Sequence, residues 1–277
     1  MTIWQSVIMG IVEGFTEFLP ISSTAHLILT GEILKIPASE FLKTYNISIQ
    51  LGAILAVVVL YWRKIFNSKD LFLKILAAFI PTTIIGLTFY QIVKTYLMES
   101  LWLIAATLFL GGIILILFEK RYEKKNKNLT EKPGIEEIET EEIKQETEKM
   151  ISYKQAVLIG IFQTFAMVPG VSRSGATIIG GLWLGLKRKT IVEFSFLLAI
   201  PTMAAATFLD LIKSREALTN LSSSDINAWI VGFIVSFIMA VIGVKFLLHY
   251  IQKNNFIAFG WYRIALGLLI VLVLLQI

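Results

Sequence analysis

Residues 20–24 have the sequence Pro-Ile-Ser-Ser-Thr, and residues 169–174 have the sequence Pro-Gly-Val-Ser-Arg-Ser. These segments interrupt the apolar stretches 4–33 and 153–187, each of which exceeds the roughly 20 residues of one membrane span. Proline breaks a helix interior and serine caps a helix start, so each stretch is expected to fold as helix, loop and helix. Irregular backbone is tolerated at membrane depth only within protein or beside water. We therefore predict two re-entrant helical hairpins.

Six further apolar segments have the length of single membrane spans. They are residues 43–62, 72–93, 101–118, 190–212, 228–248 and 257–276. Hydrophobic residues make up 56% of the 277-residue chain and charged residues 16%, whereas soluble domains carry about 25% charged residues. This composition excludes an ordinary soluble globule and predicts an all-α polytopic membrane protein. The absence of cysteine excludes disulfides and thiolate metal sites.

The two halves of the chain resemble each other at an offset of 150 residues. Gln5, Gly10, Ile11, Phe15 and Ser22 match Gln155, Gly160, Ile161, Phe165 and Ser172, and Glu13 matches Gln163. Residues 1–118 and 153–277 then each contain one hairpin and three spans. Because an odd number of spans reverses the direction of the second half, we predict two inverted repeats joined by a charged linker, residues 119–152.

Basic residues set the expected orientation in the membrane. They are concentrated in residues 63–74, the linker and residues 187–189, and the positive-inside rule places these segments in the cytoplasm. Both termini then lie outside, the hairpins enter from opposite sides, and their tips can meet near the midplane. The linker is expected to be a solvated tether, helical in part from 135 to 150, with a regulatory role as the alternative.

Two carboxylates stand out in the first hairpin. Glu13 and Glu17 are spaced i, i+4 and therefore share one face of the leading helix. A charged residue at the bilayer centre costs at least about 2.5–3.5 kcal/mol, so two of them need compensation. A divalent cation or the guanidinium of Arg173 would provide this compensation. The structural alternative is that both carboxylates lie at a hydrated interface, because Glu13 is close to the N-terminus.

The loop after Glu17 is expected to bind an anion. The helix that resumes near Ser23 directs backbone N–H groups into this loop, together with the hydroxyls of Ser22 and Ser23. His26 follows one turn later and is expected to face the same space. Its surroundings favour a functional role over that of a satisfied core histidine.

The second hairpin is expected to contribute a phosphate clamp. Gly170 allows an unusual backbone angle, and Ser172 or Ser174 can cap the helix that follows. Arg173 presents a bidentate fork that suits phosphate oxygens. The structural alternative is a buried arginine–glutamate pair that holds the two hairpins together.

These residues also carry a resemblance to a known family. Glu13-x-x-x-Glu17-Phe-x-Pro-x-Ser-Ser-x-x-His26, followed by Pro169-Gly-x-Ser-Arg-Ser-x-x-Thr177, resembles the paired signature of the undecaprenyl-diphosphatase family, also called bacitracin-resistance proteins. Both motifs match without a departure, and the spans and repeat agree over nearly the whole chain apart from the linker. The resemblance implies a membrane phosphatase that removes the terminal phosphate of undecaprenyl diphosphate for cell-wall synthesis. It also implies a divalent metal, Mg²⁺ or Ca²⁺, and a site on the outer face of the cytoplasmic membrane.

Roles for the candidate residues follow from the needs of phosphoryl transfer. The phosphate charge must be neutralised, which we assign to Arg173, the helix N-termini and a metal held by Glu13 and Glu17. Three nucleophiles stay open: Ser23, His26, and a water activated by Glu17, of which the two side chains are favoured. The remaining candidates are expected to bind substrate, namely Ser22, Gly170, Ser172, Ser174 and Thr177.

The expected partners are a polyprenyl diphosphate lipid and the lipid bilayer, with a homodimer as one possible assembly. Nucleic acid is not expected, because the basic residues sit beside apolar segments rather than in one cluster. The main alternative function is a transporter or flippase of a phosphorylated lipid or anion, because inverted repeats with broken helices also build transporters.

Overall fold

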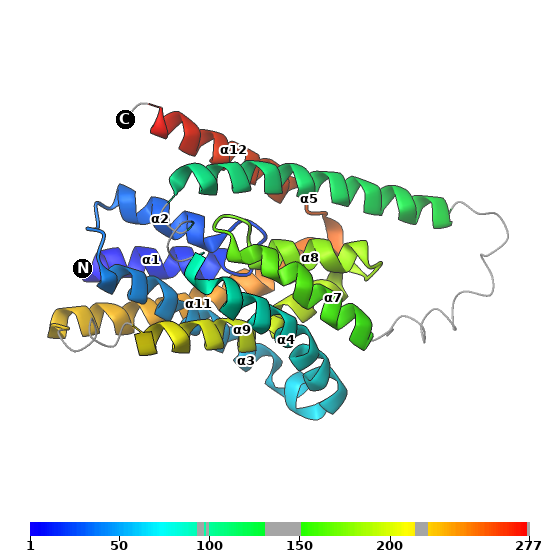
Figure 1. The fold of residues 1–277 in the computed structure, drawn as a ribbon, viewed down its shortest axis with the longest axis horizontal. Coiled ribbons are helices and arrows are strands. Elements are labelled where there is room, and N and C mark those ends of the chain that lie inside the picture. The colour runs from blue at the N-terminus through cyan, green and yellow to red at the C-terminus, as the bar shows by residue number, and fades with distance from the viewer. Residues whose placement is uncertain (93–96, 98–99, 131–150, 214–220, 276–277) are drawn as a thin grey trace.

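The computed structural model describes residues 1–92, 97, 100–130, 151–213 and 221–275, which form ten α-helices and one 3-10 helix (Figure 1). The helices of the first half are α1 (Ile3–Thr16), α2 (Ser23–Ile33), α3 (Glu40–Asn67), α4 (Lys69–Ile92) and α5 (Leu101–Thr130). Those of the second half are α7 (Tyr153–Thr164), η2 (Phe165–Met167), α8 (Arg173–Trp183), α9 (Arg188–Lys213), α11 (Ser223–Lys253) and α12 (Ile257–Leu274).

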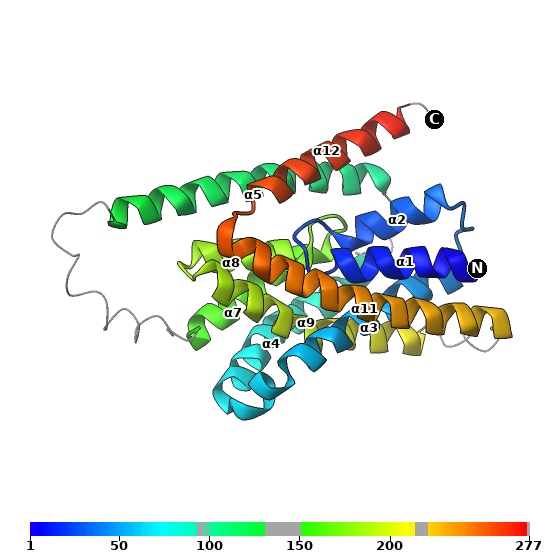
Figure 2. The same ribbon diagram turned by 180° about the vertical axis from the view of Figure 1, so that it is seen from behind.

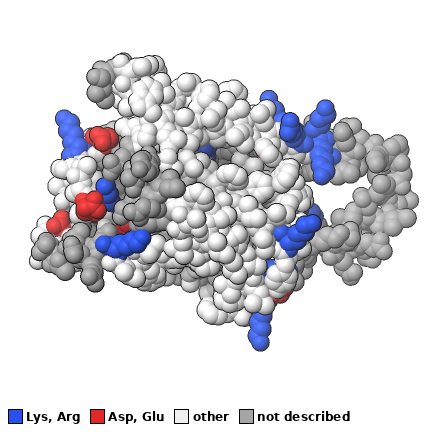
Figure 3. Space-filling view, in the orientation of Figure 1, with Lys and Arg blue, Asp and Glu red and all other residues white. Residues whose placement is uncertain are grey.

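Six of these helices are long and apolar enough to cross a membrane, namely α3, α4, α5, α9, α11 and α12. They coincide with the six spans expected from the sequence, so the prediction of an all-helical, polytopic membrane protein is confirmed. Lysine, arginine and acidic side chains gather toward the two ends of the long axis, and the visible surface between them is almost free of charge (Figure 3). This distribution suits a chain whose middle lies in lipid.

Both expected helix breaks occur. The first lies between the end of α1 at Thr16 and the start of α2 at Ser23, and the second between η2 and α8. Ser22 and Ser172 have φ angles of 71° and 73°, and Gly170 has a φ of 87°. A left-handed conformation at a non-glycine residue persists only where the surroundings impose it. The backbone conformations of the two loops are therefore imposed by the residues packed around them.

The same local contacts recur in the two hairpins. Each leading helix begins with a capping box, closed by Gln5 in α1 and by Gln155 in α7. Gln5 Nε2 then donates to the Leu34 carbonyl at 3.1 Å, and Gln155 Nε2 donates to the Leu184 carbonyl at 3.4 Å. In both halves this glutamine ties the start of the first hairpin helix to the end of the second.

Each hairpin packs against a long helix of the other half. In Figures 1 and 2, α1 lies along α11 and α7 lies along α4, while α5 pairs with α12. Glycine makes the close approach possible, because a Cβ on Gly14 would lie 2.2 Å from the Ser236 carbonyl oxygen. A Cβ on Gly160 would lie 2.0 Å from the Ala78 carbonyl oxygen. This packing brings the two hairpin loops together at the centre of the molecule (Figure 1).

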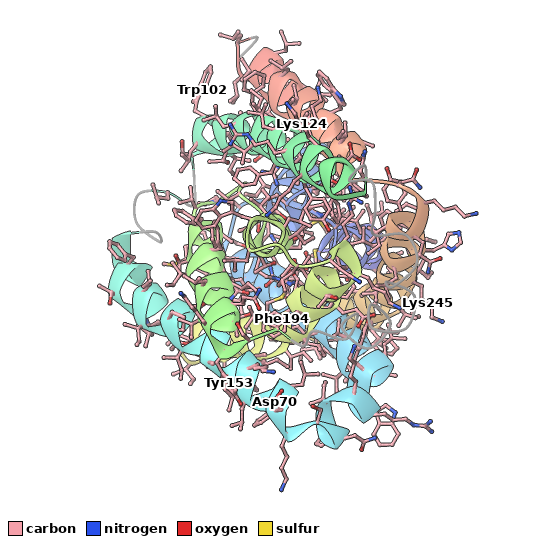
Figure 4. All side chains as sticks on the ribbon, turned by 90° about the vertical axis from the view of Figure 1, so that its right-hand side faces the viewer. Asp70, Trp102, Lys124, Tyr153, Phe194 and Lys245 are labelled. Atoms are coloured by element: carbon pink, nitrogen blue, oxygen red, sulfur yellow. The ribbon has the colours of Figure 1, made fainter. Side chains whose placement is uncertain are left out.

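The start of α1 and the end of α12 lie at one end of the molecule (Figure 1). The end of α5 and the start of α7 lie at the opposite end, which we call the linker end (Figure 1). Figure 4 views the molecule from the linker end and shows Asp70 of α4 beside Tyr153 of α7. The Tyr153 hydroxyl donates to Asp70 Oδ1 at 3.1 Å, which fastens α7 to α4 at this end.

The beginning of the expected linker differs from the prediction of a solvated tether. Helix α5 continues through residues 119–130, and the Glu119 side chain is fully buried. Arg188 Nε donates to Glu119 Oε1 at 2.7 Å, so the carboxylate is compensated and the helix remains packed beyond its apolar part. The helix expected over residues 135–150 lies outside the described residues.

Candidate active site

Glu17, Ser23 and Arg173 meet where the hairpin loops join. Arg173 Nη2 donates to Glu17 Oε1 at 2.9 Å, and Ser23 Oγ donates to Glu17 Oε2 at 2.5 Å. Glu17 directly follows α1, Ser23 begins α2, and Arg173 begins α8. The Glu17 side chain is 7% exposed and that of Arg173 is 12% exposed. One buried carboxylate therefore binds a hydroxyl from its own hairpin and a guanidinium from the other.

A cavity of about 130 Å³ opens beside these side chains. Its lining comes from α2, α3, α8, α9, η2 and both loops: Glu17, Ser22, Ser23, Thr24, Gln50, Ala166, Pro169, Gly170, Ser172, Arg173 and Met203. The first residues of α2 and α8 are both in this lining. Two helix N-termini and a guanidinium at one cavity favour an anionic ligand.

Further contacts fix the orientation of Arg173. Its Nη1 donates to the Ser195 carbonyl at 2.9 Å, and its Nη2 lies 3.3 Å from Met203 Sδ, both on α9. The guanidinium also lies 5.5 Å from the ring centre of Phe18. The buried arginine–glutamate pair considered as the structural alternative is thus present. The same arginine also lines the cavity, so a ligand bound there would meet its guanidinium.

Glu13 lies one turn before Glu17 and is completely buried. Neither of its carboxylate oxygens has a hydrogen-bond partner among the described residues. A buried ionised carboxylate without partners is costly, and a bound cation would relieve that cost. Within the described residues, no group of three or more His, Cys, Asp and Glu side chains could hold a metal. A cation here would therefore need hydroxyl, water or ligand oxygens beside the two carboxylates.

His26 is not part of the cavity lining, and its ring contacts α12. Its Nδ1 is 2.7 Å from the Ser22 carbonyl oxygen, and its Nε2 is 2.7 Å from the Tyr262 hydroxyl. The His26 and Tyr262 rings stack with 5.6 Å between their centres. His26 was expected to face the same space as Ser23, but the structure places its ring against α12. The reason is that α12 brings the Tyr262 hydroxyl and ring to His26.

Three other predicted residues organise the second loop and α8. Ser172 Oγ accepts a hydrogen bond from Gly175 N at 3.2 Å and so caps α8, as expected. Ser174 Oγ donates to the Leu19 carbonyl at 2.8 Å, and Thr177 Oγ1 lies 2.7 Å from Ser195 Oγ. Ser174 and Thr177 are absent from the cavity lining. The structure thus places them where they tie α8 to the first loop and to α9.

No residue of α12 was predicted to take part in the site, yet Tyr262 contacts His26 and Arg263 contacts both loops. Arg263 is 2% exposed and donates to four backbone carbonyls. The available signal was that Arg263 is the only charged residue in the apolar segment 257–276. A charged residue inside a span is by default a candidate for function.

Comparison with known proteins places this chain in a family. A family model described as bacitracin resistance protein BacA matches residues 6–269. The chain is 47% identical over 268 residues to an undecaprenyl-diphosphatase of Aquifex aeolicus, covering 97% of each chain. It is 49% identical over 269 residues to an undecaprenyl-diphosphatase of a Sulfurihydrogenibium species, covering 97% of this chain and 98% of the relative. It is 43% identical over 272 residues to one of Methanococcus aeolicus, covering 98% of each. The match extends over almost the entire sequence, and the chain therefore belongs to the bacitracin resistance protein BacA family.

Proposed function

We propose that this membrane protein is an undecaprenyl-diphosphate phosphatase. It hydrolyses undecaprenyl diphosphate to undecaprenyl phosphate and inorganic phosphate, which recycles the lipid carrier for peptidoglycan synthesis and confers bacitracin resistance. The observation that carries the proposal is the contact of the Ser23 hydroxyl with the Glu17 carboxylate, beside Arg173 and two helix N-termini. The names of the relatives and of the family support the same activity.

Binding of the terminal phosphate falls to the cavity at the two loops. Arg173 is held by α9 through the Ser195 carbonyl, so its guanidinium is oriented before substrate arrives. A preorganised guanidinium stabilises the charge of the transferring phosphoryl group without reorganisation during the reaction. Ser22, Ser172 and Gly170 line the same cavity and shape it around the phosphate oxygens.

Ser23 is the nucleophile that the contacts favour. A serine needs an adjacent base, and Glu17 Oε2 accepts the Ser23 hydrogen bond at 2.5 Å. The Ser23 oxygen would form a bond to the terminal phosphorus while the bond to the bridging oxygen breaks and the serine proton passes to Glu17. Undecaprenyl phosphate leaves, and water then releases inorganic phosphate from Ser23. A water activated by Glu17 is the alternative, whereas both ring nitrogens of His26 already have other partners.

Glu13 and Glu17 are the residues that would hold a divalent cation, Mg²⁺ or Ca²⁺. The unpartnered carboxylate of Glu13 fits this role, because hard cations prefer oxygen ligands. When bound, such a cation would supply positive charge to the phosphate oxygens. Glu13 itself neither lines the cavity nor contacts the Ser23 hydroxyl, so its role would be to retain the cation.

The finer topology is part of the same proposal. We infer that residues 1–118 and 153–277 are inverted repeats whose hairpins, 4–33 and 153–187, enter the membrane from opposite sides. Two observations support this arrangement. The glutamine contacts of α1 recur in α7, and each hairpin packs against a long helix of the other half. The charge distribution supports a site that opens to the outside of the cytoplasmic membrane, with the linker end in the cytoplasm.

The direct test is phosphate release from undecaprenyl diphosphate by the purified protein, with and without chelator. We expect release that Ser23→Ala lowers at least about a hundredfold, because a base-activated nucleophile is lost. Ser223→Ala changes an exposed serine on α11 and serves as the matched control. Absence of release by the unsubstituted protein would overturn the proposal. Movement of the intact lipid across vesicles without release would favour the transporter instead.

A further inference from the structure

Arg263 joins the two hairpin loops to the α5–α12 pair. Its Nη1 donates to the Pro20 carbonyl at 3.2 Å and to the Val171 carbonyl at 2.9 Å. Its Nη2 donates to the Gly170 carbonyl at 3.0 Å and to the Thr107 carbonyl of α5 at 3.2 Å. One guanidinium from α12 thus holds the first loop, the second loop and a neighbouring helix at the same time.

The surroundings of Arg263 leave little room for another position of the guanidinium. A Cβ on Gly111 would lie 2.1 Å from Arg263 Nη2, and a Cβ on Gly175 would lie 3.4 Å from Nη1. Helix α5 also holds the second loop directly, because Thr107 Oγ1 donates to the Pro169 carbonyl at 2.7 Å. The position of the Arg263 guanidinium and the conformation of the two loops are therefore fixed together.

The charge of Arg263 has no acidic partner in the described part of the chain. All four acceptors are neutral carbonyl oxygens. A fully buried cation with only neutral partners is costly, and a well-packed apolar side chain would often be the more stable solution. An anion in the adjacent cavity, which Gly170 lines, would provide the missing negative charge.

The contact with Val171 also orients the next peptide group. In a trans peptide the C=O and N–H point in opposite directions, so the Ser172 N–H is directed away from Arg263. Ser172 lines the cavity, and its N–H has no hydrogen-bond partner among the described residues. An N–H held in this way is a preorganised donor for a phosphate oxygen.

We propose that Arg263 is a positioning residue for phosphoryl transfer, a role that rests on the proposed phosphatase function. It turns the carbonyls of Pro20, Gly170 and Val171 toward itself and leaves the Ser172 N–H for the phosphate. Arg263 does not touch the reacting atoms in this role. It sets the shape of the loops that carry Ser23 and Arg173.

The kinetic test compares Arg263→Lys with Arg188→Lys. Lysine keeps the charge but cannot span four carbonyls with a planar fork. We expect kcat per folded molecule to fall on the order of a hundredfold in Arg263→Lys, because a small misplacement of reacting groups has effects of this size. Arg188 pairs with Glu119 at the linker end, and its substitution should leave turnover unchanged. A lowered melting temperature with unchanged turnover per folded molecule would make Arg263 merely structural.

A second test reports on the loop without using activity. The chain has no cysteine, so Ile21→Cys, at a position 6% exposed beside Pro20, gives a single thiol in the first loop. We expect its alkylation to become at least about tenfold faster when Arg263→Lys is added, because the loop opens locally. Ile159→Cys, at a fully buried position of α7, should stay protected in both backgrounds.

The outcomes separate the two proposals. Unchanged alkylation of Ile21→Cys would overturn the positioning role of Arg263, whatever the rate of phosphate release. Equal acceleration at Ile159→Cys would mean general unfolding and would also overturn it. A third outcome is faster alkylation confined to the loop, together with no phosphate release by the unsubstituted protein. That outcome would support Arg263 as the residue that holds the loops and would overturn the phosphatase function.

Discussion

Glu17 and Arg173 are 156 residues apart in the sequence and form an ion pair of 2.9 Å across the junction of the two hairpin loops. Removal of one member of a buried pair leaves an uncompensated charge. In the absence of a bound anion, Glu17 and Arg173 therefore stabilise each other. A phosphate in the cavity would compete with Glu17 for the guanidinium. The pair therefore links assembly of the halves to binding of the ligand.

Substitution of Arg173 separates these two effects. Arg173→Lys retains the positive charge next to Glu17 but loses the planar fork, so the protein should still fold. We expect its rate of phosphate release to fall about a hundredfold or more, the usual effect of losing one preorganised donor. Turnover per folded molecule and melting temperature in detergent are the two measurements, with Arg173→Ala as the more severe variant. A normal turnover with reduced stability would show that Arg173 only holds the hairpins together.

Substitution of Glu13 tests the cation. Glu13→Gln keeps the shape of the side chain and removes a ligand charge, and Gln163 at the matching place of α7 is equally buried. We expect weaker binding of Mg²⁺ or Ca²⁺ by calorimetry, and a higher cation concentration for half-maximal phosphate release. Glu32→Gln changes an exposed carboxylate on α2 and is the control. Identical cation binding by Glu13→Gln and the unsubstituted protein would exclude Glu13 as a ligand.

The contact between α1 and α11 predicts the effect of a single methyl group. Gly14→Ala would place a Cβ 2.2 Å from the Ser236 carbonyl oxygen, so the helices must separate. Overpacking of this kind typically destabilises by about 1–3 kcal/mol, and we expect a lower melting temperature in detergent. Gly86→Ala in α4 is the matched control, because its Cβ would meet no atom within 4 Å. If both variants melt at the same temperature, the close helix contact is wrong.

The orientation in the membrane can be tested by cysteine labelling in the cysteine-free chain. Thr2→Cys and Gln252→Cys place exposed thiols near the start of α1 and near the end of α11 at the linker end. With a membrane-impermeant maleimide on intact cells, we expect Thr2→Cys to react and Gln252→Cys to react only after lysis. The reverse pattern would invert the proposed topology.

Local patterns in the sequence were sufficient for the spans and for the two breaks. Apolar length identifies α3 or α11 directly, and proline followed by serine marks the loops around Ser22 and Ser172. These are properties of neighbouring residues. Glu17 and Arg173 could also be paired in advance, because two opposite charges inside apolar segments need each other.

Other contacts between distant segments could not be predicted from patterns of neighbouring residues. Arg263 and Tyr262 take part in the site only because α12 packs along α5 and over the hairpin loops. The position of His26 was missed for the same reason, since its ring bonds to α12. Glu119 was assigned to a solvated linker because its partner, Arg188, comes from the other half of the chain.

The packing of each hairpin against a long helix of the other half has a consequence for biosynthesis. Helix α1 lies along α11, which begins only at Ser223, so the ribosome must complete most of the chain before the first hairpin meets its partner helix. Before Arg173 is synthesised, Glu13 and Glu17 are in a nascent protein that lacks the guanidinium paired with Glu17. A messenger cut short before α8 would yield a product with unmatched carboxylates in the bilayer. Such a fragment would be an obvious substrate for the proteases that clear incomplete membrane proteins.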